Sequence, residues 1–213
     1  MQTYDYAVSG AVCSNEITPR YFSVINAPFP AVMQYEVPAY IAESKLGGEC
    51  AEQSMDIPPQ ETVYSIWIGT NDLGEDAFIT DSQVDGKTIP DYIECIYSSL
   101  DKVYDNGGRY FVLMNIAPLQ LTPLYATPEN GGVGPNHYWP DKPDNLTEIS
   151  YRMWEQVANV NDVFKYQTPF ELLIQKRYPG ASFAVMDMNG LVSTLTSNLA
   201  GRVIDLIDLR DLP

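Results

Sequence analysis

The chain has 213 residues, of which 45% are hydrophobic, and this is enough to build the core of one α/β domain of ordinary size. Its 28 acidic and 12 basic residues give a formal net charge of -16, which repels phosphate backbones and anionic lipid surfaces, so nucleic acid is excluded as an expected partner. No apolar run reaches the length of a membrane span, and the first residues lack the basic start and apolar core of a signal peptide.

The first predicted elements are a short strand and a helix. Residues 4–8 form an apolar run that ends in small side chains at Ser9 and Gly10. Residues 35–46 are expected to form a helix, because Pro38 suits its first turn and two glycines follow its end.

A second strand and a longer amphipathic helix follow. The apolar run at residues 63–68 predicts a buried strand, and it ends abruptly in Gly-Thr-Asn-Asp. Pro90 suits the first turn of a helix, and Asn106 with the next two glycines suits its end. One face of this helix is apolar at spacings of three and four residues: Ile89, Ile93, Ile96, Leu100 and Val103.

The second half of the chain repeats this alternation. Residues 110–116 predict a strand, and a long loop rich in proline and glycine follows. A helix is expected to begin at Asn145, which has capping-box spacing to Glu148, and residues 181–187 predict a further strand. The apolar stripe of this helix is Ile149, Met153, Val157, Val160 and Phe164.

Strands that alternate with amphipathic helices are typical of a parallel sheet with helices on its faces. Such sheets place their functional sites at the carboxyl ends of the strands, where Gly10, Asn71 and Pro118 are expected to lie. We find no linker and no internal repeat, so residues 1–213 are interpreted as a single domain. On composition alone, Gly-Thr-Asn-Asp is also the usual makeup of an ordinary turn.

Three cysteines, Cys13, Cys50 and Cys95, are far apart and have no Cys-x-x-Cys spacing. A metal cluster is therefore not expected, and at most one internal disulfide is possible. The sequence leaves its pairing open.

Two motifs resemble the SGNH, or GDSL-type, hydrolases. The sequence YAVSGA at residues 6–11 is similar to their second sequence block, and IGTND at residues 68–72 is similar to their third. The surrounding stretches VYSIWIGTNDLG, YFVLMNIAPL and ATPENGGVGPNHYWP resemble fungal secreted members, the carbohydrate esterases of family sixteen and related acetylesterases. The resemblance runs over residues 3–191, and residues 192–213 diverge from it.

This resemblance implies a flavodoxin-like three-layer sandwich that hydrolyses acetyl or short acyl esters, on small molecules or polysaccharides, outside the cell and without a cofactor. Gly10 would offer its backbone N–H, and Asn71 its side-chain N–H, to the oxyanion that forms when a serine attacks the ester carbonyl. One such donor is worth about 3 to 4 kcal/mol. Asp72 would support the loop that carries Asn71.

The chain departs from the family pattern in two blocks. The nucleophile block, Gly-Asp-Ser, occurs nowhere in the 213 residues, and the Asp-x-x-His block is absent because the single histidine, His137, has Gly134 three positions before it. Ser9 has no partner base by the family pattern, so we expect a structural role for it. The chain itself is therefore expected to be inactive, and we hypothesise that it is an incomplete or misread translation of a longer gene.

An alternative interpretation is a noncatalytic remnant that binds carbohydrate through its loops. His137, Tyr138 and Trp139 lie together in the loop rich in proline and glycine and are the residues expected to meet a substrate.

The resemblance also implies the strand order two-one-three-four-five. The missing first strand would then be an interior strand, placed between residues 4–8 and residues 63–68. Without it, we expect a gap or a rearranged edge beside residues 63–68.

Overall fold

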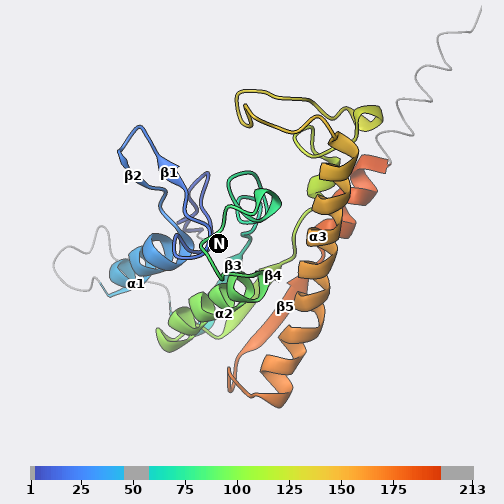
Figure 1. Ribbon diagram of the computed structural model, residues 1–213. Coiled ribbons are helices and arrows are strands. Elements are labelled where there is room, and N and C mark those ends of the chain that lie inside the picture. The colour runs from blue at the N-terminus through green and yellow to red at the C-terminus, as the bar shows by residue number, and fades with distance from the viewer. Residues whose placement is uncertain (1–2, 46–57, 198–213) are drawn as a thin grey trace, which may run out of the picture.

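The computed structural model describes residues 3–45 and 58–197, and it confirms the α/β class (Figure 1). Its main sheet has three parallel strands, β3 (Val63–Ile66), β4 (Tyr110–Met114) and β5 (Ser182–Met186), in the order β3-β4-β5. All three runs that we interpreted as strands in this part of the chain are strands, and each is a few residues shorter than its apolar run.

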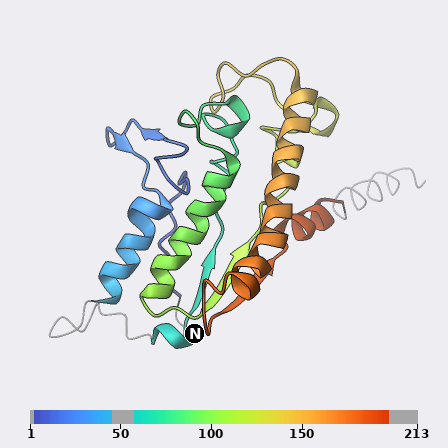
Figure 2. The same ribbon diagram turned by 60° about the horizontal axis from the view of Figure 1, so that its bottom comes forward.

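Three α-helices, α1 (Val37–Ser44), α2 (Ile89–Asp105) and α3 (Leu146–Pro169), lie side by side along one face of this sheet (Figure 2). The apolar stripes predicted for α2 and α3 point into the core, where they meet the strand side chains. The side chains with the least exposure include Tyr92, Ile93, Ile96, Tyr97, Met153, Val157, Phe164, Phe111 and Leu113.

Short elements complete the described residues. A two-stranded antiparallel sheet is formed by β1 (Tyr21–Phe22) and β2 (Ala27–Pro28), and residues 188–197 are helical. Single turns of π-helix or 3-10 helix are Val32–Glu36, Pro59–Glu61, Phe78–Thr80, Leu119–Leu121, Pro128–Asn130 and Phe170–Ile174.

Side chains cap the starts of α2 and α3, and of these two caps Asn145 was the one predicted. Thr88 precedes α2 and forms a capping box with Asp91, whose carboxylate accepts the Thr88 backbone N–H at 2.8 Å. Asn145 precedes α3, and its Oδ1 accepts the Glu148 N–H at 3.2 Å. Capping supplies partners for the first N–H groups of a helix, so these starts are fixed locally.

The strand expected at residues 4–8 is not formed. Backbone N–H groups here are taken by side-chain carboxylates: Ala7 donates to Asp5 at 2.9 Å and Val8 donates to Glu36 at 2.9 Å. A strand requires a neighbouring strand to accept its hydrogen bonds, and none of the described residues supplies one here. The apolar run indicated a buried segment, but it carried no information about pairing.

β3 is an edge strand, because among the described residues it pairs only with β4. This agrees with the gap expected beside residues 63–68. One face of the sheet is also uncovered by the residues that the structure describes. It exposes Val63 (62%), Trp67 (52%), Tyr110 (47%) and Met186 (42%). Parallel sheets normally bury both faces, so this surface is unusual for its fold class.

One internal disulfide joins Cys13 to Cys95, and Cys50 lies outside the described residues. The bond ties the loop after Gly10 to the middle of α2 across 82 residues of sequence. Closing a loop of that length is worth about 4 to 5 kcal/mol on chain-entropy estimates. It therefore fixes the first loop against the helical layer.

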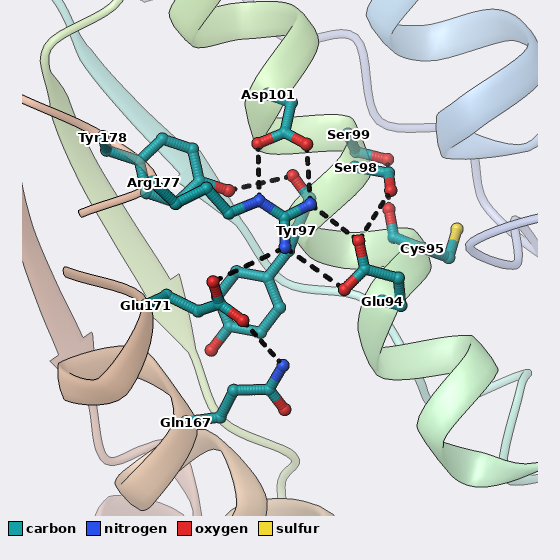
Figure 3. A network of polar contacts seen from close by, with 10 residues as sticks. All are labelled: Glu94, Cys95, Tyr97, Ser98, Ser99, Asp101, Gln167, Glu171, Arg177 and Tyr178. Carbon is teal, nitrogen blue, oxygen red and sulfur yellow. Dashed lines mark hydrogen bonds and ion pairs between the residues drawn. The ribbon is translucent and has the colours of Figure 1, made fainter. Parts of the chain in front are cut away.

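An ion-pair network holds the end of α3 against α2 (Figure 3). Arg177 binds Asp101 through Nε at 2.9 Å and through Nη2 at 2.6 Å, and Nη2 also meets Glu94 at 2.6 Å. Glu171, in the turn Phe170–Ile174 that follows α3, lies 3.7 Å from Arg177 Nη1. A bidentate arginine in a network orients its partners better than isolated surface pairs do. The network therefore links α2 to the turn that follows α3.

Candidate active site

Gly10 and Asn71 are brought together by the fold. The Asn71 Nδ2 donates to the carbonyl oxygen of Ala11 at 2.8 Å, across 60 residues of sequence. Asn71 lies in the turn that follows β3, where Leu73 N donates to the Gly69 carbonyl at 2.9 Å. The turn predicted from composition is present, and Asn71, the donor that the resemblance implies, lies in it.

Gly10 has a backbone conformation that favours glycine. Its φ is +91°, and a Cβ built on it would lie 2.6 Å from Cε1 of Phe29. Within the described residues the Gly10 N–H donates no hydrogen bond, so it is available to a ligand. A backbone donor that is left free at the end of a loop has the chemistry that an oxyanion hole requires.

We expect Gly10→Val to destabilise the protein more than Gly86→Val does. Gly86 has a φ of +77° with open space around its missing Cβ, so its variant suffers only the left-handed backbone strain of about 1 to 2 kcal/mol. The Gly10 variant adds a clash with Phe29, and overpacking costs about 1 to 3 kcal/mol more. Urea unfolding of both variants measures the difference, and equal losses would contradict the Phe29 contact.

Arg20 binds residues at both predicted donor positions, and no motif in the sequence marks it. Its Nη1 donates to Asn71 Oδ1 at 2.6 Å and to the Gly10 carbonyl at 3.0 Å. The guanidinium lies over the ring of Phe29, 5.1 Å from its centroid. Arg20 stands in an irregular loop far from both motifs, so no spacing or periodicity marks it.

The buried carboxylate of Asp72 binds residues of the segment that follows Gly10. The side chain has no exposed surface, and its carboxylate accepts the backbone N–H of Cys13 at 3.0 Å and the hydroxyl of Thr18 at 2.8 Å. Burial raises the pKa of Asp72 to about 6, against the lowering effect of these hydrogen bonds and of Arg20. A buried carboxyl group thus ties the loop of Gly10 to the loop of Asn71.

Stability should fall as the pH rises from about 4 to about 6, because of Asp72. In the unfolded chain an aspartate has a pKa near 3.8, whereas in the folded protein the pKa of Asp72 is about 6. Between these values the folded state binds more protons, and the loss reaches about 3 kcal/mol, at about 1.4 kcal/mol per pKa unit. Asp72→Asn should flatten this pH dependence in denaturant titrations, while Asp162→Asn, an exposed change on α3, should not.

The loop that contains His137 packs against the turn after β3 through aromatic residues. Trp139 is 4% exposed and packs on Tyr125, with ring centroids 6.2 Å apart. The Tyr125 hydroxyl accepts the backbone N–H of Glu75 at 3.1 Å. His137 and Tyr138 are exposed, so of the three predicted loop residues these two have surface to offer a substrate.

The ends of β4 and β5 carry a cluster of amide and carboxylate side chains. Pro118 is buried, and Asn115, Asp187 and Asn189 bind one another at the ends of β4 and β5. They line one end of a cavity of about 720 Å³ between α3 and β5. Ser9 is exposed.

Metal ligands and membrane spans were also sought in the described ranges. Across residues 3–45 and 58–197, no three His, Cys, Asp or Glu side chains are grouped as metal ligands would be. None of the helices in these ranges combines the length and apolarity needed to cross a bilayer.

Comparison with known proteins points to esterases, although no family model matches the chain. Over 190 residues it is 38% identical to an acetylesterase of Hypocrea jecorina, an alignment that covers 89% of this chain and 53% of that relative. An acetylesterase of Thermothelomyces thermophilus is 28% identical over 133 residues, covering 60% of this chain and 39% of the relative. A GDSL esterase/lipase of Zea mays is 34% identical over 64 residues, covering 30% of this chain and 16% of the relative.

These homologues support an SGNH/GDSL acetylesterase-like family, in agreement with the two sequence blocks. The chain spans about half the length of the Hypocrea relative and a smaller share of the other two.

Proposed function

We propose that this chain supplies the oxyanion-stabilising part of the active site of a GDSL-type carboxylic ester hydrolase. The observation that carries the proposal is the meeting of Gly10 and Asn71, two donors from separate loops, at one edge of the fold. Similarity to two acetylesterases supports acetyl or other short acyl esters as substrates. Carbohydrate is the proposed alcohol, as in the carbohydrate esterases that the sequence resembles.

The chemistry follows from where negative charge develops. When a serine attacks the ester carbonyl, the carbonyl oxygen becomes an oxyanion that needs donors already aimed at it. Gly10 offers its backbone N–H, which no described residue accepts, and Asn71 offers the second N–H of Nδ2, since the first is held by Ala11. Both donors are neutral, so neither changes its protonation state during the reaction. Asp72 keeps their two loops together.

We propose further that the nucleophile and the base are not among these 213 residues. The sequence contains no Gly-Asp-Ser, and its one histidine lies in an exposed loop position. An extracellular location is also proposed, and the Cys13–Cys95 disulfide supports it because such bonds persist in oxidising compartments.

Labelling with a serine-directed fluorophosphonate tests the proposal. Two proteins are compared: the purified 213-residue chain and the polypeptide translated from the complete transcript, whatever its length. We expect the second protein to be labelled and to hydrolyse p-nitrophenyl acetate, and the first to show neither property. Labelling and turnover by the 213-residue chain would overturn the missing-nucleophile proposal.

If the complete transcript encodes a protein that is neither labelled nor active, the ester hydrolase proposal fails. The noncatalytic carbohydrate-binding alternative would then be favoured, and binding of acetylated xylan would be its direct measurement.

A further inference from the structure

We infer that Arg20 is a positioning residue of the oxyanion hole, which acts by holding the Asn71 carboxamide in its donating orientation. This inference deepens the proposed function and rests on it. Nothing in the two sequence blocks assigns a role to an arginine at this position.

The orientation of the amide follows from what arginine can do. A guanidinium has only donors, so the atom of Asn71 that lies 2.6 Å from Arg20 Nη1 must be the acceptor, Oδ1. The Nδ2 group then faces the Ala11 carbonyl at 2.8 Å with one of its hydrogens. Its second hydrogen makes no hydrogen bond to any described residue and stays free for an oxyanion.

The positive charge of Arg20 strengthens the Nδ2 donor of Asn71 as well as orienting it. A cation bound to the amide oxygen draws electron density away from the nitrogen, and hydrogen bonds in such a chain polarise one another. Bonds that involve an ionised partner are also shorter and stronger than neutral ones. Without Arg20, only the Ala11 carbonyl would hold the Asn71 amide, so Oδ1 would lose its fixed partner and Nδ2 would lose the polarising charge.

The guanidinium is itself held firmly. Its face packs on the Phe29 ring, and the Arg20 carbonyl accepts the Phe29 N–H at 2.8 Å. Asn15 closes the arrangement, because its Oδ1 accepts the Arg20 N–H at 3.2 Å and its Nδ2 donates to the Phe29 carbonyl at 2.7 Å. The same Phe29 ring occupies the space that a Cβ at Gly10 would need. The loop that contains Arg20 and Phe29 therefore contacts both Gly10 and Asn71.

A matched control exists elsewhere in the chain. Arg109, like Arg20, uses Nη1 to bind two oxygen acceptors, in this case the backbone carbonyls of Tyr104 at 2.9 Å and Gly108 at 2.6 Å. Its guanidinium lies over the Tyr104 ring, 4.3 Å from the centroid. It precedes β4, at the opposite end of the strand from the site. Arg109→Met thus removes a similar set of contacts without touching Asn71.

The first test observes the Asn71 amide directly in the 213-residue chain carrying Val63→Lys, a substitution that places a charge on the exposed sheet face and favours the monomer. Its Nδ2 signal in a nitrogen-15 correlation spectrum is identified by its loss in Asn71→Ala. We expect Arg20→Met to shift this signal toward those of solvent-exposed asparagines, Arg20→Lys to shift it less, and Arg109→Met to leave it in place. Backbone signals that keep their positions in each variant show that the fold is retained.

The second test measures kinetics in the product of the complete transcript. Arg20→Met should lower kcat for p-nitrophenyl acetate by about tenfold to a hundredfold, because a charged hydrogen bond is lost, with little change in KM. In an Asn71→Ala background the same substitution should cost nothing further, because Arg20 acts through Asn71.

The two tests distinguish a failure of the positioning role of Arg20 from a failure of the ester hydrolase proposal. An unshifted Asn71 signal in Arg20→Met overturns the positioning role, and so does an additive loss in the double variant. A shifted signal in the chain, together with an inactive transcript product, leaves the contact established and refutes the ester hydrolase proposal instead. If Arg20→Met does not fold, the Arg20→Lys spectrum and kinetics decide between the same outcomes.

Discussion

Replacing Asn71 with alanine should lower kcat of the transcript product about a hundredfold or more while KM stays nearly unchanged. The amide donates to charge that develops only in the transition state, so its loss raises the barrier without weakening substrate binding. The geometry supports a strong effect, since the donor is bonded at both Oδ1 and Nδ2 and needs no reorganisation during the reaction. Steady-state kinetics with p-nitrophenyl acetate measure both parameters.

Asn159→Ala is the control for this experiment. The Asn159 side chain is exposed on α3 and makes no hydrogen bond to the described residues, so its substitution should leave kcat unchanged. Thermal unfolding of both variants separates catalysis from stability, because Asn71 also holds the Ala11 carbonyl. An Asn71→Ala enzyme with normal kcat would remove Asn71 from the oxyanion hole.

Most of the regular structure followed from local sequence signals. Thr88 and Asn145 fix the starts of α2 and α3 through their own hydrogen bonds, and the apolar stripes of both helices are buried as their periods predict. These features depend on residues within a few positions of one another. The antiparallel pair β1 and β2 was missed, because strands of two residues are too short to show a period.

Features that depend on distant residues were harder to anticipate. The apolar run at residues 4–8 is unpaired because a strand exists only with a neighbour, and its N–H groups bind Asp5 and Glu36 instead. Tryptophan is a residue type that often binds sugars, so Trp139 was expected to meet a substrate. In the structure it is buried and packs against Tyr125. The sequence blocks indicated Gly10 and Asn71, whereas Arg20 reaches them from a loop that no motif marks.

The uncovered face of the main sheet has consequences for how the chain behaves in solution. Val63, Trp67, Tyr110 and Met186 are exposed on it, and no strand of the described residues pairs with the free edge of β3 beside them. Apolar area costs about 25 cal/mol per Å² when it stays in water, and free strand edges pair readily with other chains. The disulfide and the ion pairs of Arg177 stabilise the opposite, helical side and leave this face unprotected.

The 213-residue chain, expressed alone, is therefore expected to self-associate through this face and edge into dimers or larger aggregates. Val63→Lys should raise the monomer fraction, because it places a charge on the apolar face beside the open edge. Val24→Lys is the matched control, since Val24 is 80% exposed in the β1–β2 turn, away from the sheet. Sedimentation velocity over a range of concentrations measures the distribution. A wild-type chain that sediments as a monomer and unfolds sharply and reversibly on heating would show that the sheet tolerates its open face.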